Sequence, residues 1–254
     1  MGTKLFVKDG RQISLTSTGK EFLPFVEKAL DQINQGTETI RQSVSKDGNL
    51  VKLGYCYSIS SNFVPNVISH MYNFPTSKKI NFQFTLDVSK NIINLVKKDT
   101  IELGFTMHKD RNIETLPVLQ QRMFLVVPNS HPLAKKENVT LADFIKEPII
   151  VLDKNSNQRN LVKKIYAKAE AEPLIAFEVN ECNEALKGVA RGLGISILPH
   201  LPSIEALLVK FIPLDDAAFS RIVYLAWHKG RKLSPAAKYV RDFLEQHYVL
   251  KDVN

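Results

Sequence analysis

The chain has 254 residues, of which 44% are hydrophobic and 24% charged, a balance that is ordinary for a globular protein and sufficient for two modest cores. Lysine and arginine outnumber aspartate and glutamate by 34 to 26, and the net charge of +8 suits a polyanionic partner or an acidic ligand. No apolar run approaches the ~20 residues of a membrane span, and the N-terminus lacks a signal-peptide pattern. We therefore expect a cytoplasmic protein with no membrane partner.

The sequence offers little for metal, disulfide or catalytic chemistry. Cys56 and Cys182 are too few and too far apart for a disulfide scaffold or a CxxC metal site, and the histidines are scattered without metal-ligand spacing. The serines lack the G-x-S-x-G elbow of a hydrolase, and periodicity brings no carboxylate pair together. We expect no cofactor and no enzymatic activity.

Residues 1–16 are predicted to be the end of a small domain. Two short β-prone runs, Phe6-Val7 and Ile13 to Leu15, flank Asp9-Gly10, and Asp-Gly between such runs is a strong hairpin signal. A hairpin of this size cannot bury its apolar residues alone in water, so it needs a packing partner. The hydroxyl residues from Thr16 to Thr18 can accept the free N–H groups of a helix start.

Residues 17–47 are predicted to form a linker or dimerisation helix that ends near Ser45. Pro24 removes one backbone hydrogen bond, so a bend is expected there. The apolar residues form a narrow stripe, typical of a helix–helix seam, at Phe22, Val26, Ala29, Ile33, Ile40 and Val44. The alternative is an amphipathic helix packed on its own domain, but the clean stop at Lys46 to Asn49 favours dimerisation.

Beyond residue 49 strands alternate with helices, which indicates an α/β protein with mostly parallel sheets. Strands rich in branched and aromatic residues are predicted at 50–55, 80–86, 101–106, 123–128, 148–152, 175–179, 195–198 and 223–227. Helical patterns are predicted at 64–72, 92–97, 141–145, 160–169, 183–191, 204–208 and 235–247. The strands fall into two groups, and the last helix returns to the first group.

Three motifs in the chain resemble those of LysR-type transcriptional regulators, and the resemblance extends to about Tyr248. Their residues are Leu5-Phe6, Lys8, Gly10-Arg11 and Leu15 to Gly19 in the wing, then Pro128 to Leu133, then Gly192 to Pro199. The Gly-x-Gly in the last motif follows a helix rather than a strand. Its glycines therefore permit a tight turn and do not indicate a nucleotide site.

The resemblance implies a two-lobed, periplasmic-binding-protein-like effector domain, preceded by part of a winged-helix wing and by a long linker helix. Residues 48–118 and 224–254 would form the first lobe, and residues 119–223 the second. The lobes would be joined by strands that cross near Leu119–Arg122 and Ser220–Val223.

An anion site is predicted after the first strand of this domain. In open α/β sheets, ligands bind beyond the carboxyl ends of strands, next to helix N-termini. There Cys56 is followed by Ser58, Ile59 and Ser60, at the positive end of a helix, where hydroxyl and N–H groups suit a carboxylate. The same residues would serve for ordinary helix capping, which is the alternative. By the resemblance, Ser58 aligns with the hydroxyl residue that the family commonly uses to hold its effector.

The resemblance also assigns residues from both lobes to the cleft. Thr106 and Met107 would line the rim of the first lobe, and Asn180, Glu181 and Cys182 would come from the second. The Glu181 carboxylate argues against a simple dicarboxylate, unless it points away. The expected effector is therefore a small organic acid or an amino-acid-like anion.

Cys56 and Cys182 would then lie on opposite lobes beside the cleft. One hypothesis is a redox switch in which a disulfide bridges them. The other is that both are buried free thiols, which behave as small apolar residues.

Two classes of function remain after enzymes are set aside. A free-standing solute-binding module or ligand sensor would share the two lobes, but it has no use for a dimerising helix before its first strand. The favoured hypothesis is a LysR-type regulator, in which effector binding acts through a homodimer or homotetramer on promoter DNA.

The wing carries the expected DNA contacts. In the intact protein Lys8 and Arg11 would touch phosphates, and the alternative is that they are solvated hairpin charges. The helix-turn-helix helices that the family places before Leu5 are not in this sequence. This chain is therefore expected to bind its effector but not an operator.

Overall fold

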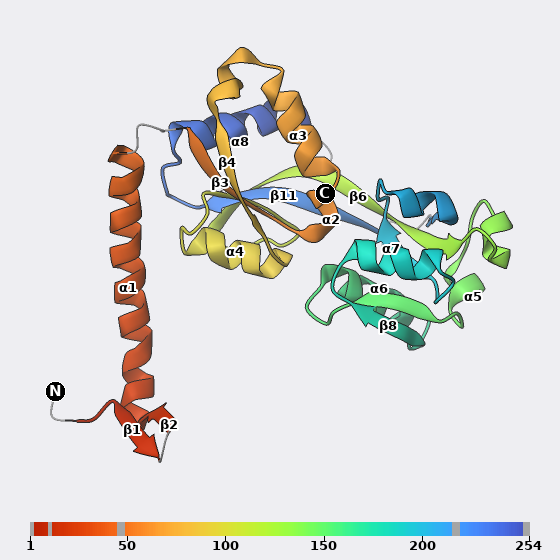
Figure 1. Cartoon of the computed structure of the whole chain (residues 1–254), viewed down its shortest axis with the longest axis horizontal. Helices are drawn as coiled ribbons and strands as arrows, with labels where there is room; N and C mark the ends of the chain where they lie inside the picture. The colour runs from red at the N-terminus through yellow and green to blue at the C-terminus, as the bar shows by residue number, and fades with distance from the viewer. Residues whose placement is uncertain (1–2, 10–11, 45–48, 215–218, 251–254) are drawn as a thin grey trace.

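The computed structural model describes residues 3–9, 12–44, 49–214 and 219–250. At its N-terminal end β1 (Phe6–Asp9) and β2 (Gln12–Leu15) pair antiparallel, and α1 (Ser17–Val44) follows as one long helix. Thr16 caps this helix, because its hydroxyl accepts the Gly19 N–H at 3.0 Å. The hairpin lies at the end of α1 that is far from the rest of the molecule (Figure 1). Gly10 and Arg11, at the hairpin turn, lie outside the described residues.

The first lobe is a five-strand portion of the main sheet with helices on both faces. Its order is β4 (Asn81–Leu86), β3 (Leu50–Tyr55), β5 (Leu103–Thr106), β11 (Ser220–His228) and β6 (Ile113–Pro128). The strand β3 is parallel to β4 and β5, whereas β11 is antiparallel to β5 and β6. One core joins α3 (Phe63–Tyr72) and α8 (Pro235–Tyr248) to the sheet, and a second core joins α4 (Ser89–Lys97) to it. The short η1 (Pro75–Lys79) leads into β4.

The second lobe is built around the far end of β6. There β6 pairs antiparallel with β9 (Ser196–Pro199) and β10 (Val209–Pro213). The strands β7 (Ile149–Leu152) and β8 (Ile175–Val179) pair in parallel, and a bridge from Ile149 to Ile195 brings β7 beside β9. The helices α5 (Leu141–Phe144), α6 (Asn157–Ala167) and α7 (Cys182–Ala190), with η2 (Pro132–Lys135) and η3 (Ile204–Leu208), complete the lobe.

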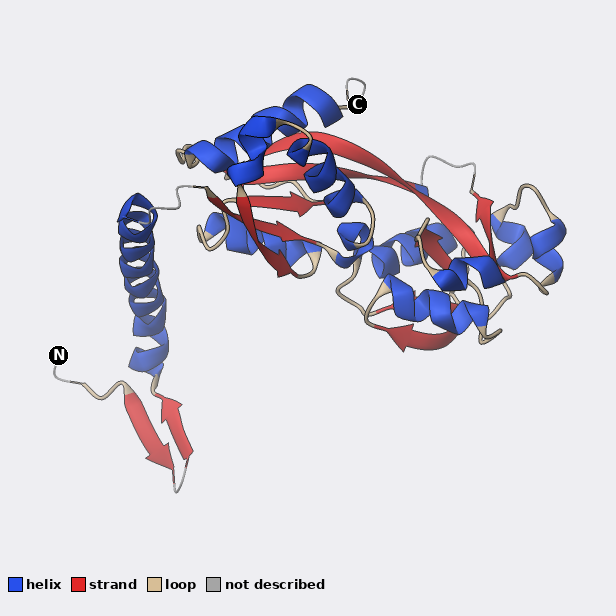
Figure 2. Cartoon of the chain, turned by 45° about the horizontal axis from the view of Figure 1, so that its top comes forward, coloured by secondary structure: helices blue, strands red, loops and turns tan. Residues whose placement is uncertain are grey.

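The two lobes are joined by β6 and β11, which run side by side from one lobe into the other (Figure 2). In the connecting stretch Leu119 lies opposite Val223, and Arg122 lies opposite Ser220. The pairing register shifts between Val223 and Tyr224, because Val118 is left without a partner. Such a bulge bends a strand and increases its twist, so the ribbon changes direction where it leaves the first lobe.

The observed elements differ from the expected ones in several places. The expectation of mostly parallel sheets is wrong, because four of the seven strand pairs described beyond residue 49 are antiparallel. The strand predicted at 123–128 begins at Ile113, because its first half pairs with β11 alone and mixes polar with apolar residues. The strand β10 was not predicted, and residues 204–208 form a 3₁₀ rather than an α-helix. Within the described ranges, no helix is long and apolar enough to cross a membrane.

Candidate functional site

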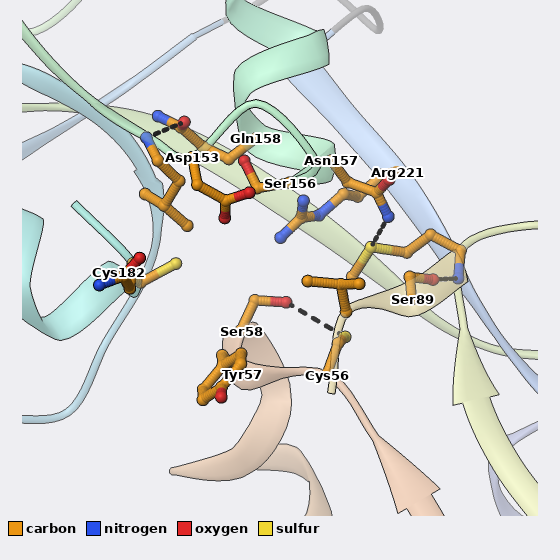
Figure 3. Close-up of a pocket in the computed structure, with 14 residues that line it drawn as sticks. Cys56, Tyr57, Ser58, Ser89, Asp153, Ser156, Asn157, Gln158, Cys182 and Arg221 are labelled. Carbon is orange, nitrogen blue, oxygen red and sulfur yellow. Dashed lines mark hydrogen bonds between the residues drawn. The ribbon is translucent and has the colours of Figure 1, made fainter. Parts of the chain in front are cut away.

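A cavity lies between the two lobes, beyond the carboxyl ends of β3 and β5 on one side and of β7 and β8 on the other (Figure 3). It holds about 410 Å³ of space not filled by atoms, including the open solvent at its mouth. Its lining is formed by Cys56, Tyr57, Ser58, Val88, Ser89, Met107, Leu152, Asp153, Ser156, Asn157, Gln158, Asn180, Cys182 and Arg221.

Three helices of nine or more residues begin at this cavity. Ser89 is the first residue of α4, Asn157 of α6 and Cys182 of α7, and all three line the space. Ser58 adds a hydroxyl from the single-turn helix α2 (Tyr57–Ser60). Helix N-termini carry free N–H groups and partial positive charge, so several of them around one space favour an anion.

Arg221 adds a full positive charge to these partial charges. It comes from β11, and its Nε donates a hydrogen bond of 2.8 Å to Oε1 of Gln121. Burial lowers the pKa of Arg221, and the described groups that oppose this effect are the thiols of Cys56 and Cys182, not a carboxylate. Arg221 is half-buried, and a partly desolvated cation without a carboxylate partner is stabilised when an anion binds it. The guanidinium lies beside the cavity in Figure 3, so a ligand anion can reach it.

Hydrogen bonds hold the polar lining in place. Ser89 Oγ lies 2.8 Å from Thr106 Oγ1 and accepts the Met107 N–H at 2.6 Å. Gln158 Oε1 accepts the Leu152 N–H at 3.0 Å, which ties α6 to β7. These contacts fix side chains before a ligand arrives, and such preorganisation reduces the entropic cost of binding.

One contact crosses the cavity from lobe to lobe. The Nδ2 of Asn157, from the second lobe, lies 3.0 Å from the sulfur of Met107, from the first lobe. A thioether sulfur is a weak acceptor, so a ligand oxygen can replace this bond at little cost.

The chain matches a known protein family over most of its length. The family model described as the LysR substrate binding domain matches residues 46–249. The chain belongs to the LysR family of transcriptional regulators. Membership carries the two-lobed, periplasmic-binding-protein-like effector domain seen here, and with it regulation of transcription by a small-molecule effector.

The family includes several similar relatives. The uncharacterized HTH-type transcriptional regulator YybE of Bacillus subtilis (strain 168) is 32% identical over 98% of this chain and 85% of its own length. The transcriptional dual regulator GltC of the same organism is 28% identical over 98% of this chain and 84% of its own length.

Solved structures of the family share the fold. The effector binding domain of QuiR, in complex with shikimate, is 28% identical with a TM-score of 0.71, and the match covers 79% of this chain and 99% of that one. The regulatory domain of CcmR from Synechocystis PCC6803, in complex with 2-PG, has a TM-score of 0.69 at 18% identity, covering 78% of this chain and 96% of that one. The second likeness concerns the fold alone.

The structure brings part of the expected effector site together. Five of the expected residues line the cavity: Cys56, Ser58, Met107, Asn180 and Cys182. The other four, Ile59, Ser60, Thr106 and Glu181, lie outside its lining.

Ile59 points into the core of the first lobe and is 1% exposed. The hydroxyl of Ser60 donates to the Tyr57 carbonyl at 2.8 Å, within α2. Thr106 is fully buried and supports Ser89 from behind. Glu181 precedes α7 at its N-cap position and does not line the cavity.

Other lining residues were missed from the sequence. Asp153 directly follows β7 in the same way that Cys56 follows β3, so the strand-end rule would have found it. Ser156 and Asn157 start α6, three residues before the predicted helix start. Arg221 stands inside a strand, and its sequence neighbours carry no signal of a site.

The two cysteines of the cavity are buried thiols. Cys56 is 7% exposed and Cys182 is 3% exposed, and Sγ of Cys56 lies 3.6 Å from the Ser58 hydroxyl. Burial raises the pKa of both thiols, that of Cys182 to about 11. Because the thiolate is the reactive form, a raised pKa slows both alkylation and oxidation.

We expect iodoacetamide at pH 8 to modify Cys182 at least about 100-fold more slowly in the native chain than in urea, since a pKa near 11 leaves roughly 0.1% thiolate. Peptide mass spectrometry after timed quenching measures the rate at each cysteine, and the unfolded chain is the control. Rapid native labelling, or a Cys56–Cys182 disulfide after mild peroxide, would contradict the inert-thiol interpretation and favour the redox switch.

Proposed function

We propose that the chain senses a small organic acid, which binds between the lobes with its carboxylate on Arg221. The observation that carries this proposal is the half-buried Arg221, which lines the cavity together with the first residues of α4, α6 and α7. Charge-assisted hydrogen bonds to a guanidinium are among the strongest that a site can offer. Ser58 supplies a further hydroxyl donor from α2.

Two further polar residues of the lining favour a second polar group on the same ligand. Asp153 and Asn180 line the cavity, and an ionised carboxylate accepts hydrogen bonds from a hydroxyl or an amino group. Shikimate, which the related QuiR domain binds, is a carboxylic acid with several hydroxyls. A hydroxy acid or an amino acid therefore matches the cavity better than a purely apolar acid does.

The proposed mechanism is a shift between arrangements of the lobes. A ligand held by Arg221 on the connecting ribbon, Ser58 on the first lobe and Asn157 on the second contacts all three parts at once. It stabilises only those arrangements in which these groups converge, and this differential affinity is what shifts the population. The ribbon of β6 and β11 is the only strand connection between the described lobes, so the change of angle occurs there.

The proposed assembly is a homodimer through α1, with a homotetramer as the higher form. The helix α1 exposes large apolar side chains that the rest of the described chain does not cover, namely Leu23, Phe25, Leu30 and Ile33. The edge strands β4 and β8 also expose apolar residues, namely Phe84, Leu86, Ile175 and Phe177. The α1 surface suits a helix–helix seam, and the edges suit contacts between effector domains.

The names of the relatives support the proposed site of action. They are named transcriptional regulators, so we place this chain in the cytoplasm with promoter DNA and assign it no enzymatic role. Lys8 is exposed on β1, where the wing of the intact regulator would approach phosphates.

A thermal-shift screen tests the proposed function. The panel comprises shikimate, other hydroxy acids, amino acids, dicarboxylates and aromatic acids. At 100 times its Kd, a bound acid stabilises the native state by about 2.7 kcal/mol, and the melting temperature rises by roughly 5–10 °C. Ser58→Leu, which fills the cavity, should remove that rise, whereas Ser130→Leu on the exposed surface should not. The proposed site would be contradicted if no compound raised the melting temperature, or if the rise were the same in Ser58→Leu as in the parent.

A further inference from the structure

Gln121 occupies a position at the connecting ribbon that the proposed mechanism has not used. It lies on β6 directly opposite Arg221 on β11, and it is 9% exposed. Its neighbours Gln120 and Arg122 on the same strand are exposed. Burying an amide destabilises the folded protein unless the amide makes hydrogen bonds there.

Both ends of this amide are engaged. The Nε2 donates to the backbone carbonyl of Ser58 at 3.0 Å, and the Oε1 accepts from Nε of Arg221 at 2.8 Å. A carbonyl only accepts and a guanidinium only donates, so the amide can adopt a single orientation. A carboxylate could not replace it, because it has no hydrogen to donate to Ser58.

We propose that Gln121 is a positioning residue, which sets the guanidinium of Arg221 and the helix α2 at the distance that the bound anion requires. This inference rests on the proposed function, since it assigns to Gln121 the geometry of that same site. By holding Nε, Gln121 directs the remaining donors of Arg221 toward the cavity (Figure 3). By holding the Ser58 carbonyl, it anchors the helix turn that carries the Ser58 hydroxyl.

The same side chain connects the site to the moving part of the molecule. Gln121 lies within the stretch in which β6 and β11 pass between the lobes. A rotation of the ribbon that displaces Gln121 therefore moves Arg221 and Ser58 together. In return, an anion that pulls on Arg221 acts on β6 through one hydrogen bond. The coupling is reciprocal, as linked equilibria require.

Two variants test the proposal, with shikimate and its carboxamide as probes. Gln121→Met removes both hydrogen bonds at nearly constant volume. Gln121→Glu keeps the shape but places a carboxylate on Arg221 and against the Ser58 carbonyl. Gln120→Glu adds the same charge one residue away on the exposed face and is the matched control. Circular dichroism and the melting temperature establish that each variant is folded.

We expect the variants to lose affinity for the acid but not for its carboxamide. Calorimetric titration should show affinity for shikimate falling about tenfold in Gln121→Met and further in Gln121→Glu, with the carboxamide nearly unaffected and Gln120→Glu like the parent. In an Arg221→Met background, Gln121→Met should lower the affinity less than it does in the parent, because only the anchor of Ser58 is left to lose. Equal losses for the acid and the carboxamide, or additive losses in the double variant, would overturn the positioning role.

A measurement without ligand separates this proposal from the proposed function. Hydrogen–deuterium exchange of residues 56–62 should be at least about fivefold faster in Gln121→Met than in the parent or in Gln120→Glu, because α2 loses its anchor. If shikimate does not bind the parent, the hydrogen–deuterium exchange of residues 56–62 is the remaining test. Unchanged exchange in Gln121→Met then overturns the role of Gln121. If shikimate binds and Arg221→Met abolishes binding while Gln121→Met changes neither readout, the proposed function stands and this inference falls.

Discussion

Replacing Arg221 with methionine is expected to lower the affinity for the acidic effector at least about 100-fold, or roughly 3 kcal/mol. The reason is that Arg221 is the cation of the cavity and has no described carboxylate to neutralise it, so the ligand anion supplies its partner. Isothermal titration of the strongest acid from the screen measures the change. Methionine keeps most of the side-chain volume, so the loss reports the charge.

Arg122→Met is the matched control for this substitution. Arg122 lies on the paired strand, opposite Ser220, and its side chain is exposed. Removing it changes the net charge of the protein by the same amount without touching the cavity, so the affinity should stay within about twofold. An Arg221→Met variant that binds the acid as tightly as the parent would place the anion elsewhere.

Replacing Gly194 with alanine is expected to destabilise the chain by about 3 kcal/mol and to lower its melting temperature by roughly 6–12 °C. Gly194 has a φ of +150°, a conformation that residues with a side chain avoid. A Cβ there would also lie 2.8 Å from the carbonyl oxygen of Pro148 and 3.3 Å from a carbon of Ile150. Backbone atoms cannot give way as the end of a flexible side chain can, so the second lobe must distort.

Gly192→Ala separates the two contributions. Gly192 also has a positive φ, +74°, but a Cβ at this position would meet nothing within 4 Å. Only the conformational strain applies, so the expected loss is about 1 kcal/mol. Chemical denaturation followed by circular dichroism measures both variants. Equal losses of unfolding free energy in Gly192→Ala and Gly194→Ala would show that the close approach to Pro148 does not contribute to the destabilisation.

Most of the fold could be predicted because its elements are local. Strands such as 50–55 and 175–179 are short runs of branched and aromatic residues, and the structure has strands at these same residues. The start of β6 was missed because residues 113–122 include a proline and several polar residues. That half of β6 is an edge strand with β11 as its partner, so only some of its residues, such as Ile113 and Val118, are buried and the apolar pattern is weak.

The candidate site could be predicted only where it follows strand ends. Cys56 and Ser58 follow β3, and Met107 follows β5, so topology alone brings them to one edge. Arg221 and Gln121 are a different case, because they meet by pairing between strands that are 100 residues apart in the chain. Neither residue has a local pattern that marks it, and only the register of β6 against β11 reveals the pair.

The path of β6 and β11 also fixes the order in which the protein can be completed during synthesis. The second lobe is a continuous insertion, since its strands from the far end of β6 to β10 lie within residues 123–213. The first lobe lacks β11 and α8 until the ribosome has passed residue 248. The second lobe can therefore fold while the first is still open, and the cleft is complete only after β11 has paired, because Arg221 comes from that strand.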